Sequence, residues 1–118
     1  MAPALRTVLL AAGILPFLLA GCTGDNRVTI AGQGYEAGTE TETLRCGDEA
    51  FLAFGVQGAG SLRITVEDGS GAEVYEDGSV GAGQDGESHT LHGEDGTWTL
   101  KVSRGLGYAG QYAITLSC

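Results

Sequence analysis

Two histidines and fifteen acidic residues are the side chains of this sequence that could take part in acid–base or metal chemistry. His89 and His92 are three positions apart, and residues with that spacing on a β-strand point to opposite faces of the sheet. They would therefore not converge on one metal ion or one substrate. The sequence also has no Gly-x-Ser-x-Gly elbow, P-loop or His-Glu-x-x-His motif. We expect no catalytic centre, and therefore not an enzyme.

The carboxylates gather in pairs at positions where the chain is expected to turn. Paired acids could act in a hydrolase. Loops at one end of a β-sandwich could also bring several carboxylates around a calcium ion, although the EF-hand spacing is absent. Acidic residues at turns most often face solvent, so we expect no bound metal and no cofactor. The calcium candidates are Asp68, Asp77, Asp85 and Asp95.

The first 22 residues have the organisation of an export signal. Arg6 and the α-amine supply positive charge, and residues 7–19 form an apolar run of signal-peptide length. That run is shorter than the roughly 20 residues that span a bilayer. It ends in the sequence Leu19-Ala20-Gly21-Cys22.

These four residues resemble the lipobox of bacterial lipoproteins. In that class a diacylglyceryl group is attached to the cysteine thiol, and a dedicated signal peptidase cuts before the cysteine. The resemblance implies cleavage between Gly21 and Cys22, lipidation of Cys22 and a membrane-anchored mature chain. Thr23 in the next position implies the outer membrane as destination, if the organism has one. An ordinary secretory signal with a chance cysteine, or an uncleaved anchor, are the alternatives.

Two cysteines remain once Cys22 carries lipid. Export would place Cys46 and Cys118 in an oxidising compartment, where disulfides persist, and two cysteines allow one intramolecular pair. On candidate strands, Cys46 shares a face with Leu44 and Cys118 shares a face with Leu116. Both sulfur atoms would then point to the core. We expect a Cys46–Cys118 disulfide, with a free thiol at either site as the alternative.

The acidity of the chain bears on its partners. The formal net charge is −9, and this excludes the basic surface that nucleic-acid binding needs. Anionic lipid surfaces would also repel the domain, so attachment must come from the leader or from a lipid. We expect a monomer whose partners are the membrane and another envelope protein or a glycan.

Alternating and apolar segments predict the fold class. Thr39, Leu62 and Trp98 each begin a segment in which apolar and polar residues alternate or Thr recurs, and Asp-Gly pairs separate several segments. About seven or eight strands predict an all-β, antiparallel, jelly-roll-like sandwich after the signal helix. Residues 1–21 would be signal peptide, 22–34 a lipidated tether and 35–118 the sandwich, with entry of residues 23–34 into the first strand as the alternative. The predicted core is Leu44, Cys46, Leu52, Phe54, Val56, Leu62, Ile64, Val66, Trp98, Leu100, Val102, Ile114, Leu116 and Cys118.

Three segments carry more specific expectations. Residues 51–56 are continuously apolar, which would suit burial on both faces. Residues 96–102 and 110–114 resemble the closing hairpin of bacterial pre-peptidase C-terminal domains and, more distantly, of convertase P-domains, which are sandwich or jelly-roll modules. Tyr108 lies in a Gly-rich loop and is either an exposed binding residue or a packed corner.

The sequence therefore predicts an envelope lipoprotein on the cell membrane or outer membrane, facing the periplasm or the exterior. Its domain would be a non-catalytic binding, assembly or accessory module. A carbohydrate- or calcium-binding module of the same fold is the alternative, and a hydrolase using acidic residues is a further one.

Overall fold

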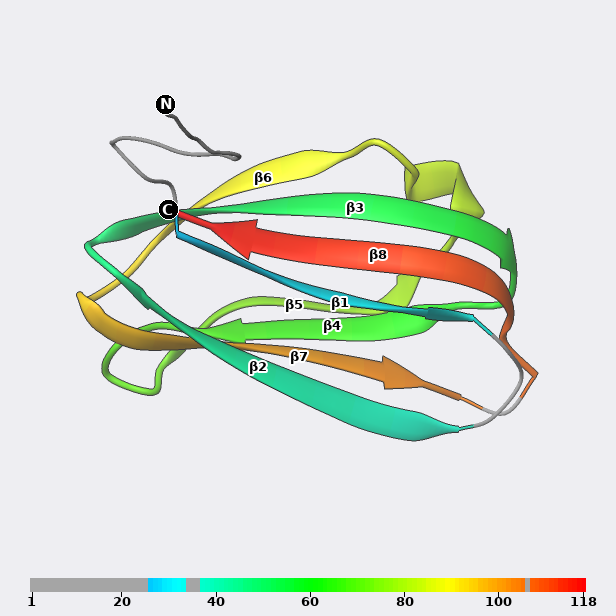
Figure 1. The fold of residues 1–118 in the computed structure, drawn as a ribbon, viewed down its shortest axis with the longest axis horizontal. Helices are drawn as coiled ribbons and strands as arrows, with labels where there is room; N and C mark the ends of the chain where they lie inside the picture. The colour runs from blue at the N-terminus through cyan, green and yellow to red at the C-terminus, as the bar shows by residue number, and fades with distance from the viewer. Residues whose placement is uncertain (1–25, 34–36, 106) are drawn as a thin grey trace, which may run out of the picture.

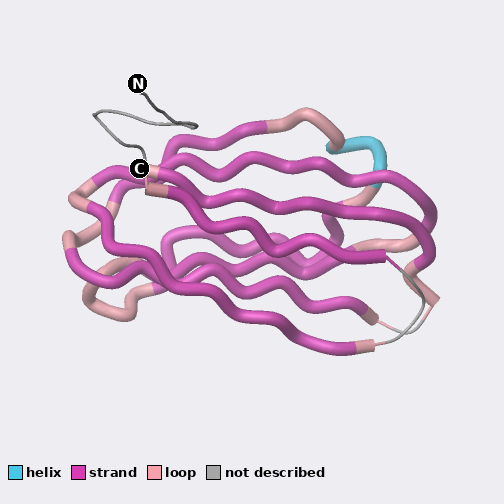
Figure 2. Tube along the Cα trace, in the orientation of Figure 1, coloured by secondary structure: helices cyan, strands magenta, loops and turns pink. Residues whose placement is uncertain are grey.

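The computed structural model describes residues 26–33, 37–105 and 107–118. The expected signal peptide, its cleavage at Gly21 and Cys22, and the lipid-carrying thiol lie outside the described residues. Two four-stranded sheets stack face to face (Figure 1), and strands make up most of the described chain (Figure 2). The elements are β1 (Arg27–Gln33), β2 (Gly38–Cys46), β3 (Glu49–Ala59), β4 (Leu62–Glu67), β5 (Glu73–Val80), the 3₁₀ turn η1 (Ala82–Gln84), β6 (Ser88–His92), β7 (Gly96–Arg104) and β8 (Ala109–Ser117).

The strand order is that of an eight-stranded jelly roll. β4 pairs with β5, β3 with β6, β2 with β7 and β1 with β8, all antiparallel, as if one long hairpin folded at the β4–β5 turn. Rolling that hairpin gives one sheet in the order β1-β8-β3-β6 and another in the order β2-β7-β4-β5. The expected jelly-roll-like sandwich is therefore confirmed. β4–β5 is the sole pair of consecutive strands in one sheet among the described elements.

The core lies between the sheets and follows the alternation of the strands. Side chains at every second position of β4, β7 and β8 are buried, with Trp98, Ile64 and Ile114 completely enclosed. Of the predicted core, only Leu44 and Cys118 are partly rather than fully buried. The structure adds six buried residues to that set, namely Ile30, Ala50, Val80, Leu91, Tyr108 and Tyr112.

The sandwich begins earlier than expected. β1 covers residues that the sequence assigned to the tether, and it pairs with β8 from Arg27 to Gln33. Ile30 is buried at its centre, with Val28 partly buried beside it. Two inward-facing apolar residues are enough to hold this edge strand on the sheet, because its backbone is hydrogen-bonded to β8. The predicted boundary at residue 35 is therefore wrong, and the domain begins by Arg27.

Two expectations about strand burial and pairing are also wrong. In the apolar run 51–56 only one face is buried, since no described element covers the outside of this sheet, and Phe51 is 45% exposed. The expected closing hairpin is not a hairpin, because β7 and β8 belong to different sheets. The connection between these strands crosses from one layer to the other, as a jelly roll requires.

The sequence predicts a turn between strands at Asp77-Gly78. That prediction is wrong, because the pair lies inside β5. The Asp77 carboxylate accepts hydrogen bonds from the amide and hydroxyl of Ser79, at 2.9 and 3.2 Å. This local loop coincides with a register shift between Leu62 and Ile64 on the partner strand β4. Gly78 and Ser79 thus lie opposite the single residue Arg63 and form a β-bulge within the strand.

Candidate functional site

The end of the sandwich at which β1 begins and β8 ends is called the proximal end below. In Figure 1 it lies at the C label. Asn26 and Cys118 exchange two backbone hydrogen bonds there, of 3.1 and 2.9 Å. The Asn26 side chain donates a further one, of 3.1 Å, to the carbonyl of Arg45. The start of the described chain is therefore fixed to its last residue.

A disulfide ties the two sheets together at this end. Cys46 ends β2 in one sheet and Cys118 follows β8 in the other, and the structure joins their sulfur atoms across 72 positions of sequence. This is the pair that the sequence predicted. Beside it, the fully buried indole of Trp98 donates a hydrogen bond of 3.1 Å to the carbonyl of Gly47.

Asp68 fastens two turns at the same end. One oxygen accepts hydrogen bonds from the amides of Ser70 and Ala72 and from the Ser70 hydroxyl, at 2.7 to 3.0 Å. The other accepts one of 2.8 Å from the amide of Glu94, in the β6–β7 loop. The Glu94 amide and the Ser70 hydroxyl are the main causes that lower the Asp68 pKa to about 2, against the opposing effect of burial. The carboxylate is thus occupied by its own turns and is poorly placed as a calcium ligand.

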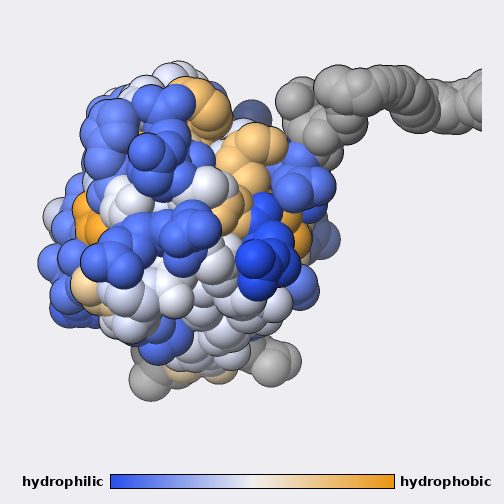
Figure 3. All heavy atoms as spheres, turned by 90° about the vertical axis from the view of Figure 1, so that its left-hand side faces the viewer, coloured by the Kyte–Doolittle hydropathy of each residue, from blue (hydrophilic) through white to orange (hydrophobic). Residues whose placement is uncertain are grey.

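An open hollow of about 490 Å³ lies beside the disulfide at the proximal end. The disulfide forms part of its lining, together with Asn26, Arg45, Asp48, Glu49 and Phe51. Among the described residues, Phe51 is the one exposed large hydrophobic side chain. Figure 3 shows this end of the molecule as a mostly hydrophilic surface with small separate hydrophobic patches.

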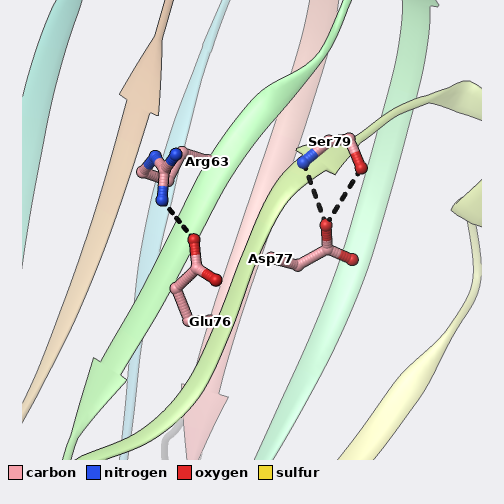
Figure 4. A network of polar contacts seen from close by, with 4 residues as sticks. All are labelled: Arg63, Glu76, Asp77 and Ser79. Atoms are coloured by element: carbon pink, nitrogen blue, oxygen red, sulfur yellow. Dashed lines mark hydrogen bonds and ion pairs between the residues drawn. The ribbon is translucent and has the colours of Figure 1, made fainter.

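The other calcium candidates do not join Asp68. Asp95 lies in the β6–β7 loop next to Gly69, whereas Asp77 lies in β5 and Asp85 follows η1. Figure 4 shows Asp77 turned to Ser79, near the exposed ion pair of Arg63 with Glu76. Asp85 accepts a hydrogen bond of 2.8 Å from the amide of Val56. Within the described ranges, no three His, Cys, Asp or Glu side chains are grouped closely enough to hold a metal ion.

The histidines lie on opposite faces of β6, as their spacing indicates. His92 is exposed, with Nδ1 3.9 Å from a carboxylate oxygen of Glu49. His89 is half-buried and packs against Phe54 and Tyr75, with ring centres 5.3 and 5.0 Å away. Burial is the main cause that raises the pKa of Tyr75, and the nearby acidic residues add to it. This cluster fills the gap between edge strands β5 and β6.

Tyr108 is a packed corner. Its side chain is buried, and its hydroxyl lies 3.1 Å from the carbonyl of Gln57 and 3.3 Å from that of Gln111. Burial raises its pKa. Gly107, with φ of +90°, allows the chain to bend sharply before it enters β8. The hydroxyl therefore holds the chain where it crosses between sheets and is not offered to a ligand.

In the described part of the chain no helix has the length and apolar character needed to cross a bilayer. No protein-family model and no curated protein matches this chain. The proposals below are therefore based on its own residues and their geometry.

Proposed function

We propose that the protein is an exported lipoprotein, anchored to a bacterial membrane by acyl chains on Cys22 once residues 1–21 are removed. The observation that carries the proposal is the sequence Leu19-Ala20-Gly21-Cys22 directly after a short apolar run. Two or three acyl chains would make the attachment stable, since each buried methylene contributes about 0.8 kcal/mol.

The pairing of Cys46 with Cys118 supports export, because such bonds persist in oxidising compartments and are rare in the cytosol. The start of the domain supports it as well. Only four residue steps separate Cys22 from Asn26, and the backbone of Asn26 is hydrogen-bonded to that of Cys118. A folded domain thus begins directly after the proposed lipid attachment.

The domain itself is proposed to be a non-catalytic binding, assembly or accessory module. Three of its carboxylates, those of Asp68, Asp77 and Asp85, accept hydrogen bonds that hold turns and strands in place. The half-buried His89 packs against two aromatic rings at tilted angles and contacts Glu87 at 3.2 Å. These groups support the fold and leave little for acid–base chemistry.

Detergent phase separation of cells that express the full chain tests the anchor. The wild-type protein should enter the detergent phase and incorporate labelled palmitate, and Cys22→Ser should do neither. Thr23→Ser is the matched control, because it changes the neighbouring residue and keeps the thiol. A Cys22→Ser protein that still behaves as a lipidated one would contradict the proposal.

A further inference from the structure

The outer face of the β1-β8-β3-β6 sheet is nearly free of charge, although the chain has a formal net charge of −9. Its charged or titratable side chains are Arg27 and the neighbouring pair of Glu49 and His92, all at the proximal end. Beyond them the cross-strand rows are uncharged, from Thr29, Thr115 and Ala53 to Gln33, Gln111 and Gln57.

The polar groups on this face partly satisfy one another. The hydroxyls of Thr29 and Thr115 are 2.9 Å apart, and the Gln111 amide donates a hydrogen bond of 2.8 Å to Gln33. Covering groups that are already paired costs less than covering free ones. This face can therefore approach another surface at a low desolvation cost.

The outer face of the opposite sheet differs sharply. It carries the exposed ion pair of Arg63 with Glu76 and a contact of 3.3 Å between Lys101 and Glu67, besides the exposed Arg45. Charged groups such as these stay in water unless a partner replaces their hydration. The two faces of the sandwich are thus unequal, and the nearly uncharged one contains β1, the strand that begins next to the proposed anchor.

The length of the connection limits where the membrane can be. Four residue steps from Cys22 to Asn26 reach about 14 Å at full extension, whereas the molecule is 48 Å long. The proximal end must therefore stay close to the bilayer. If the domain stood upright, the acidic residues Asp48, Glu94 and Asp95 of its end loops would be pressed against the lipid headgroups, and anionic lipids would repel them.

We propose that the lipid-anchored domain lies flat, with the outer face of the β1-β8-β3-β6 sheet along the phospholipid headgroups and the charged sheet toward solvent. This inference rests on the anchoring proposed above. Phe51 lies on that face near its proximal end, where its exposed ring would enter the interfacial region of the bilayer. The exposed charges of the opposite sheet then point away from the membrane. Among the carboxylates on the described strands of the contact face, only that of Glu49, beside His92, meets the headgroups.

Tryptophan quenching by brominated lipids tests this orientation. The acylated mature protein, purified from membranes of cells that express the full chain, is inserted into phosphatidylcholine–phosphatidylglycerol vesicles whose acyl chains are brominated near the headgroups. One tryptophan is added in each variant, by Phe51→Trp or by Gln57→Trp, near the two ends of β3 on the proposed contact face. Thr41→Trp on the opposite sheet is the matched control, and the fully buried Trp98 gives a common background.

The flat orientation predicts that the added fluorescence is mostly lost at positions 51 and 57 and retained at position 41. Loss at position 51 alone would mean an upright domain, and equal signals at all three positions would mean free rotation. Either result would overturn the inference while leaving the anchor intact. Protein that does not float with the vesicles would instead overturn the anchoring, and the orientation with it.

Discussion

Breaking the Cys46–Cys118 disulfide should lower the free energy of unfolding of the domain by about 4 kcal/mol. The bond closes a loop of 72 sequence positions, and the chain-entropy treatment assigns such a loop about 15 cal/mol/K of lost freedom in the unfolded state. Small domains have total stabilities of about 5–15 kcal/mol, so this loss is a large fraction of what holds the fold.

Urea unfolding of the domain from Thr23 onward measures the loss, with the fluorescence of the single buried Trp98 as signal. With a denaturant slope of roughly 2 kcal/mol/M, the midpoint should fall by about 2 M. The Cys46→Ala, Cys118→Ala double variant and the reduced wild type should agree to within about 1 kcal/mol, since both lack the cross-link and differ by two sulfur atoms. A midpoint that falls by less than about 0.5 M would refute the loop-closure reasoning.

Three further perturbations test other parts of the structure. Because the Asp68 pKa is about 2 when folded and its ordinary value is 3.8, its stabilisation is present above about pH 4 and is lost as the pH falls toward 2. Asp68→Asn should flatten that decline in unfolding curves, and equal slopes would contradict it. Gly110→Ala should cost at least about 2 kcal/mol, because φ is +140° and the added Cβ would lie 2.1 Å from a carbonyl oxygen. Gly83→Ala, with open space around it, is its control and should melt close to wild type. Tyr108→Phe should cost about 1 kcal/mol in thermal unfolding, since the part-buried hydrogen bonds of its hydroxyl to the carbonyls of Gln57 and Gln111 are lost, and an unchanged melting temperature would count against the packed corner.

Much of the core could be predicted because strand alternation fixes which side chains face inward. Ile64, Leu100 and Ile114 lie at alternate positions of β4, β7 and β8, and each is completely buried. The same alternation placed Cys46 and Cys118 toward the core, and the disulfide followed from assigning Cys22 to lipid, which left one pair. Local pattern was sufficient wherever one face of a strand had to be buried.

The pairing of strands could not be read from local signals. Asp95-Gly96 does mark a turn, but β6 and β7 lie in different sheets, so the turn joins two layers and is no hairpin. Phe51 belongs to an apolar run, and its exposure depends on the outer face of its sheet being uncovered. The local sequence shows that a segment is apolar, whereas the burial of each of its side chains depends on which distant strands pack against it.

The arrangement at the proximal end likewise depends on long-range contacts. The Asp68 carboxylate accepts a hydrogen bond from the amide of Glu94, 26 positions away. The backbone of Asn26 is hydrogen-bonded to that of Cys118. Asp68 was a calcium candidate because its position in a turn can be predicted from the sequence, whereas its hydrogen bond with the Glu94 amide cannot. The uncharged sheet face was equally hidden, since its rows combine residues of β1, β3 and β8.

Intact-mass spectrometry of the protein extracted from its native membrane tests the proposed cleavage before Cys22 and the lipidation of its thiol. We expect a chain that begins at Cys22, heavier than its residues by a diacylglyceryl group and, in many bacteria, one further acyl chain. We also expect two hydrogens fewer, for the bond between Cys46 and Cys118. A chain that retains residues 1–21, or one that begins at Cys22 with no added lipid mass, would contradict the proposal.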